Sequence, residues 1–161
     1  MKCMMVLLLV VAASRVAAAS GSSIFATNCA ACHQLNGQGV PGVYPPLKDT
    51  VGDYVRVPAG RVYLAHVVSF GMTGTIASQD KTYNGVMQPR AQLSDADVAD
   101  VLNHVLTELN AAVLPKGFLR FTAEEVKPLR AKVLTLGEVH SERDALMKTL
   151  AANGAPAQVQ R

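Results

Sequence analysis

The sequence predicts an all-α domain with a large share of loop. Apolar residues recur at helical spacing in three segments, residues 22–36, 59–69 and 94–109, and no segment shows the pattern of a parallel sheet. The 161 residues are 50% hydrophobic, yet only 5% are aromatic and none is Trp. The large side chains that usually fill a core are therefore scarce, and we expect another apolar body to fill it.

The first 19 residues have the layout of a secretory signal peptide. A positively charged start precedes an unbroken apolar run at residues 4–13, and residues 17–19 offer an Ala-x-Ala cleavage site. The run is too short for a membrane-spanning helix, which needs about 20 residues. We expect cleavage after residue 19 and export to the periplasm; the alternative is an uncleaved membrane anchor.

Cleavage changes the charge and cysteine counts. It removes Lys2, Arg15 and Cys3, so the formal charge falls from +3 to +1, and two cysteines remain in 142 residues. Neither charge is large enough for a nucleic-acid-binding protein, whose basic residues gather in patches. Two cysteines are also too few for a disulfide scaffold.

The remaining cysteines stand in the first helical segment as Cys29-Ala30-Ala31-Cys32-His33. Cys-x-x-Cys-His is the attachment motif of c-type haem. Positions i and i+3 lie on one helix face, where two thiols can form thioethers with the two vinyl groups of one porphyrin. The following His33 can then ligate the iron. Three alternatives are a thioredoxin-like redox pair, a zinc site and a structural disulfide, but they lack, respectively, a preceding strand, further ligands and a role for His33.

A Gly/Pro-rich loop, residues 34–47, follows the motif. A haem-ligating His usually donates its second ring N–H to a carbonyl oxygen, and Pro45 is our candidate acceptor for His33. Residues 22–110 resemble a class I cytochrome c of the bacterial periplasmic kind. The resemblance rests on Phe25, residues 29–33, Gly37-Gln38-Gly39, Pro45-Pro46-Leu47, Tyr83-Asn84-Gly85-Val86-Met87 and the helix at 93–102.

The resemblance implies one covalent haem c with three or more helices wrapped around it. Cys29 and Cys32 would carry the thioethers, and Pro45 and Leu47 would contact the haem. By the match, the second axial ligand to the iron is Met87, on a loop before the last helix. Gln88 separates this Met from Pro89, whereas in the family Pro often follows directly.

Other residues could compete with Met87 for the iron. They are Met72, His66 and His104, while Met147 lies in the tail. A Met in a protein is more often core filling than a ligand. His66 is expected to be a packing or surface residue. His104 falls where the family often has an aromatic at the crossing of the first and last helices, and a partly exposed position is expected for it.

The other elements follow from local patterns. Residues 51–57 and 75–79 are predicted as short extended pieces. Ser94 can cap the helix at 94–109, with Asp97 at its third position. Domain boundaries are predicted at 20–110 for the cytochrome c domain and 111–161 for a helical extension.

The extension carries no chemical constellation. Thr122 can open a helix in which Pro128 forces an early end or a kink. Residues 138–151 are predicted to form a last helix, with His140 on a solvated face. The extension is expected to pack on the domain or to dock a partner.

The expected ligands determine the expected function. With His33 and Met87 bound, the iron has no open position, which implies a one-electron carrier rather than an enzyme. We expect it to connect a periplasmic dehydrogenase with a terminal oxidase or reductase, and to meet a membrane only through partners or an uncleaved signal. Alternatives are a fixed subunit of a dehydrogenase complex and, if Met87 does not ligate, a five-coordinate haem sensor or enzyme.

Overall fold

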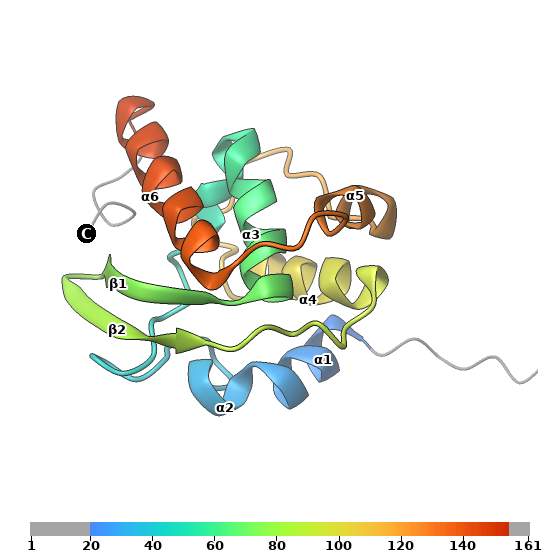
Figure 1. Cartoon of the computed structure of the whole chain (residues 1–161), viewed down its shortest axis with the longest axis horizontal. Helices are drawn as coiled ribbons and strands as arrows, with labels where there is room; N and C mark the ends of the chain where they lie inside the picture. The colour runs from blue at the N-terminus through green and yellow to red at the C-terminus, as the bar shows by residue number, and fades with distance from the viewer. Residues whose placement is uncertain (1–19, 155–161) are drawn as a thin grey trace, which may run out of the picture.

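The computed structural model describes residues 20–154, which form helices around one antiparallel hairpin (Figure 1). The predicted signal peptide at 1–19 and the last residues of the extension lie outside this range. In chain order the elements are α1 Gly21–Asn28, α2 Ala30–His33, the 3-10 helix η1 Gly52–Arg56, α3 Pro58–Phe70, β1 Met72–Ser78, β2 Lys81–Met87, α4 Asp95–Thr107, α5 Ala123–Leu129 and α6 Leu136–Ala152.

The first predicted helix is two helices, and it ends early. Ser20 caps α1 by accepting a hydrogen bond from the backbone N–H of Ser23. Cys29 then leaves helical geometry, with φ −122° and ψ −36°, and α2 continues from the next residue. Gln34 adopts φ 63°, which ends α2 three residues before the predicted boundary.

The extended piece predicted at 51–57 is wrong, because this segment is the helical turn η1. Asp53 and Arg56 pair across three residues, a spacing that brings side chains together in a helical turn and not in a strand. The piece predicted at 75–79 is largely correct, since it falls mostly in β1. A two-residue turn joins β1 to β2, and both of its residues, Gln79 and Asp80, have positive φ, as hairpin turns of this length require.

The helix predicted at 94–109 is confirmed as α4, with the Ser94–Asp97 capping box. It crosses α1 closely at Gly21, where an added Cβ would overlap the backbone oxygen of Asp100. One turn along the crossing, the rings of Phe25 and His104 are 5.4 Å apart. His104 is half-buried and packs against Phe25, so it takes the place of an aromatic at the crossing.

The extension packs on the rest of the molecule. Thr122 caps α5, which ends one residue after Pro128, so the proline limits this helix as predicted. In Figure 1, α6 lies along α3 and over β1, while α5 lies beside α4. Val126 of α5 and Val139 of α6 are fully buried. The prediction of a solvated His140 is wrong, because its Nε2 lies 3.0 Å from the backbone oxygen of Thr75 in β1.

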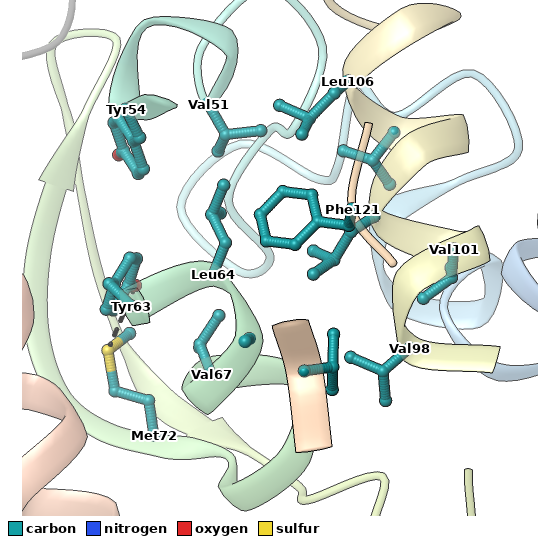
Figure 2. Close-up of a cluster of buried hydrophobic side chains, with 14 of the residues drawn as sticks. Val51, Tyr54, Tyr63, Leu64, Val67, Met72, Val98, Val101, Leu106 and Phe121 are labelled. Carbon is teal, nitrogen blue, oxygen red and sulfur yellow. Dashed lines mark hydrogen bonds between the residues drawn. The ribbon is translucent and has the colours of Figure 1, made fainter. Parts of the chain in front are cut away.

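The buried side chains form one core (Figure 2). Leu64 and Val67 of α3 lie between the tyrosines Tyr54 and Tyr63 on one side and Phe121 of the extension on the other. No helix within residues 20–154 has both the length and the apolar character needed to cross a membrane.

Candidate functional site

A cavity of about 230 Å³ opens beside the cysteine motif. Cys29, Cys32 and His33 line it from the first helices, and Met87 lines it from the end of β2. Residues from η1, α3, β1 and α4 complete the lining. The motif and Met87, 54 residues apart in the sequence, therefore face the same space.

His33 is held in one orientation by the loop that follows it. Its Nδ1 lies 2.9 Å from the backbone oxygen of Pro45, which is the predicted partner. Burial lowers the pKa of His33 and the charge of Arg90 lowers it further, while the hydrogen bond to Pro45 raises it. The net lowering favours a neutral ring whose Nδ1–H donates to Pro45, and this leaves Nε2 with the lone pair that binds a metal.

The loop itself depends on close backbone contacts. The backbone N–H of Gly39 donates to the backbone oxygen of His33 at 2.9 Å, and that of Leu47 donates to Gly37 at 2.7 Å. Gly39 has φ 65°, and a Cβ there would overlap the backbone oxygen of Tyr44. A glycine is therefore required at this point for Pro45 to reach His33.

Cys29 and Cys32 are both free thiols. Burial raises the pKa of the Cys29 thiol to about 11, with a small opposing effect of Arg90. A reactive redox cysteine needs a lowered pKa, so this environment does not suit a thioredoxin-like pair. A zinc site is not favoured either, because residues 20–154 contain no group of three or more His, Cys, Asp or Glu arranged to hold a metal ion.

Two methionines lie opposite one another in the hairpin, since Met72 pairs with Met87 in the strand register. The position of Met87 is the last residue of a strand, and the loop predicted for it is wrong. The Tyr63 hydroxyl donates to the Met72 sulfur at 3.6 Å. Within the described residues, the Met87 sulfur accepts no hydrogen bond, although both side chains line the cavity.

The two histidines that could compete for a metal lie outside the cavity lining. His66 is buried, with Nδ1 at 2.8 Å from Glu142 and Nε2 at 2.9 Å from the backbone oxygen of Leu129. Both of its nitrogens are therefore engaged, and the packing role predicted for it is confirmed. His104 packs on Phe25 instead.

A model of the cytochrome c family matches residues 18–108. The chain belongs to the cytochrome c family. Its cofactor is haem c, and its role is that of an electron carrier. The donor set at the cavity fits this cofactor, because two thiols three residues apart, an imidazole with a free nitrogen and a thioether sulfur surround one apolar space.

Two similar relatives are both named cytochrome c-552. One, from Thermus thermophilus, is 49% identical over 128 residues, which is 80% of this chain and 97% of the relative. The other, from an individual strain of the same species, is 49% identical over 130 residues, 81% of this chain and 87% of the relative. Residues 1–110 cannot supply 128 aligned positions, so the similarity continues into the extension.

A third relative matches a shorter part. It is the cytochrome c subunit of a quinone alcohol dehydrogenase from Gluconobacter oxydans, and it is 35% identical over 86 residues. These residues are 52% of this chain and 17% of that protein.

Several cavity residues are not predictable from the sequence pattern. Tyr54, Tyr63 and Arg143 line the cavity, and so does Arg90, whose Nε donates to the backbone oxygen of Asn28 at 2.9 Å. None of them belongs to a motif with fixed spacing to Cys29. An isolated buried arginine can be recognised as a site residue only after folding places it beside the cavity.

Proposed function

We propose that this cytochrome c is an exported carrier of single electrons in which Cys29 and Cys32 hold the haem by thioethers and His33 and Met87 are the two axial ligands. Haem c supplies a one-electron couple at its iron. The observation that carries the proposal is the shared cavity: the motif lines it from one side, and the last residue of β2 lines it from another.

The choice of Met87 over Met72 rests on their partners. The Met72 sulfur already accepts a hydrogen bond from the buried Tyr63 hydroxyl, and giving it up would leave that hydroxyl without this acceptor. Met87 has no such bond to lose within the described residues. A thioether ligand raises the potential relative to a second histidine, which suits a carrier that delivers electrons to an oxidase or reductase.

The proposed location and partners follow from the sequence and the site. Residues 1–19 are proposed as a cleaved signal peptide, and thioether attachment takes place outside the cytoplasm in bacteria. With both axial positions filled, the remaining task is exchange with redox proteins, which we propose to be a periplasmic dehydrogenase as donor and a terminal oxidase or reductase as acceptor. The proposed division places the cytochrome domain at 20–110 and the extension at 111–161.

The rim of the cavity offers a surface for such partners. Val43, Tyr44 and Val86 line the cavity and are also exposed, Val86 with 53% of its surface. Exposed apolar groups beside a redox centre suit brief contacts with a partner that presents an apolar patch of its own. Because the charge without residues 1–19 is +1, electrostatic steering toward partners should be modest.

Spectroscopy of the purified haem protein tests the axial ligation. The ferric protein should show an absorbance band at about 695 nm, the mark of methionine–iron ligation in this family. Met87→Leu should abolish the band, whereas the matched control Met72→Leu should keep it, since both exchanges conserve volume. The mass of the mature protein should equal residues 20–161 plus one haem.

The opposite outcomes would change the assignment. A wild-type protein that lacks the band and binds carbon monoxide without delay has an open iron position, and the carrier proposal is then wrong. Loss of the band in Met72→Leu but not in Met87→Leu would exchange the roles of the two methionines.

A further inference from the structure

Arg143 is a buried cation that comes from the extension. It lies in the middle of α6, and only 6% of the residue is exposed. Its Nη2 donates to the backbone oxygen of Ala77 in β1 at 2.7 Å. Among residues 20–154, no carboxylate forms an ion pair with it. A buried charge is costly unless an opposite charge accompanies it, so the position of Arg143 calls for an anion.

The acidic residues beside it on α6 are paired with other groups. Glu142 lies 2.8 Å from Nδ1 of His66 in α3, and Asp144 lies 3.6 Å from Nδ1 of His140. Two half-buried arginines have carboxylate partners, Glu125 for Arg61 and Asp95 for Arg130. The contrast makes Arg143 the buried arginine for which a counter-ion has still to be assigned in the described part of the chain.

Arg143 faces the same cavity as the cysteine motif, together with Tyr54 and Tyr63. The rings of the two tyrosines are 6.0 Å apart, and both side chains are buried (Figure 2). Burial raises the pKa of both phenols, and the charge of the Arg143 guanidinium opposes that rise. This part of the lining therefore combines one cation with two hydroxyls that stay protonated at neutral pH, which is the environment of a bound carboxylate.

Haem c brings two propionate carboxylates into such a cavity. We infer that Arg143 is the counter-ion of a haem propionate, so that the extension supplies a binding residue to the haem site and helps to set its potential. This inference rests on the proposed placement of haem between His33 and Met87. A cation beside the haem favours the ferrous state, because reduction removes one positive charge from the iron. Loss of the Arg143 charge should therefore lower the midpoint potential.

Spectroelectrochemical titration of three haem-loaded variants tests the inference. Arg143→Gln removes the charge and retains an N–H donor for Ala77, while Arg143→Lys retains the charge. Lys148→Gln is the matched control, because it removes a charge from an exposed position of the same helix. Titrations in 0.01 M and 1 M salt, where the Debye lengths are about 30 Å and about 3 Å, separate a buried charge from a surface charge.

The expected result is a lower potential for Arg143→Gln in both salts. At a fixed applied potential its ferric-to-ferrous ratio should rise about tenfold, which is about 59 mV for one electron. Arg143→Lys should stay within about twofold of wild type, and any shift in Lys148→Gln should vanish in 1 M salt. The inference is overturned if Arg143→Gln stays within twofold of wild type, or if Arg143→Lys falls as far as Arg143→Gln.

A measurement on the wild type covers the case in which Arg143→Gln does not load haem. In an experimental structure of the haem-loaded protein, a propionate oxygen should lie within salt-bridge distance of the Arg143 guanidinium, and a longer separation for both propionates refutes the pairing. The band at about 695 nm is recorded on the same samples. Its presence with an unchanged potential refutes the role of Arg143 alone, whereas its absence in wild type refutes the axial assignment.

Discussion

Replacing Asn110 by Ala should strongly destabilise the protein. This residue follows α4, is 0% exposed and makes four hydrogen bonds through its side chain. Its Oδ1 accepts from the backbone N–H groups of Thr50 and Gly52, and its Nδ2 donates to the backbone oxygens of Leu47 and Val105. Asn110 thus connects the end of α4 to the loop that carries Leu47, a residue of the cavity lining.

The size of the effect follows from the number of bonds. A neutral hydrogen bond contributes about 1 kcal/mol net, and a buried backbone group left without a partner costs about 1–3 kcal/mol. Water that enters the vacated space can restore part of the loss. We therefore expect Asn110→Ala to lower the free energy of unfolding by about 3–5 kcal/mol, a large share of the about 5–15 kcal/mol of a typical domain.

Asn103 provides a matched comparison on the same helix. It is buried too, but its side chain makes two hydrogen bonds, both to the backbone of Phe121. Asn103→Ala should therefore cost about half as much as Asn110→Ala. Urea unfolding of the haem-loaded variants, followed by helical circular dichroism, measures both. A cost below about 1 kcal/mol for Asn110→Ala, or a cost smaller than that of Asn103→Ala, would refute the reasoning.

Three further predictions concern backbone fit, pH and partner docking. Gly137→Ala should stabilise α6 by about 0.5–1 kcal/mol, because no atom lies within 4 Å of the added Cβ, whereas Gly60→Ala should destabilise, because its Cβ would overlap the backbone of η1; thermal unfolding compares them. The pKa of Tyr63 is raised in the folded state above its unfolded value of about 10, so its contribution to stability is complete below about pH 10 and is lost as the pH rises further. In Tyr63→Phe the alkaline decline measured by urea unfolding should be shallower by about 1.4 kcal/mol per pH unit, and an unchanged slope would contradict this. Val86→Asp at the cavity rim should slow electron exchange with a redox partner in stopped-flow assays, while Val133→Asp, which is also exposed but lies outside the cavity lining, should not; equal effects of the two would exclude the rim as the docking surface.

Features governed by local chemistry were predictable from the sequence. The Ser94–Asp97 capping box and the short helix that ends after Pro128 each depend on residues within one or two turns. The bond between His33 and Pro45 was predictable because a ligating histidine needs a carbonyl partner and the loop is short. The family resemblance drew the same motif and Met87 together before any coordinates were known.

Features governed by contacts between distant segments were not predictable. Met87 was placed on a loop because Gly85 and Pro89 weaken a strand, yet pairing with β1 extends the strand to its last residue. Residues 51–57 have the β-branched residues of a strand, but the Asp53–Arg56 pair and Pro58 at the start of α3 favour a helical turn. His140 has acidic neighbours typical of a solvated face, and only the packing of α6 on β1 shows that it meets Thr75.

The contacts of α6 bear on what the extension does. Three side chains of this helix bond to elements that line the cavity: Glu142 to His66 of α3, His140 to the backbone of β1, and Arg143 to the backbone of β1. Its apolar face is buried in the same core as α3 and α4. A segment that only docked a partner would keep such a face free in the isolated protein. The burial of this face and the alignment of the Thermus relatives beyond residue 110 both indicate that the extension covers the haem-binding core, in which case a partner must approach by the exposed rim around Val86.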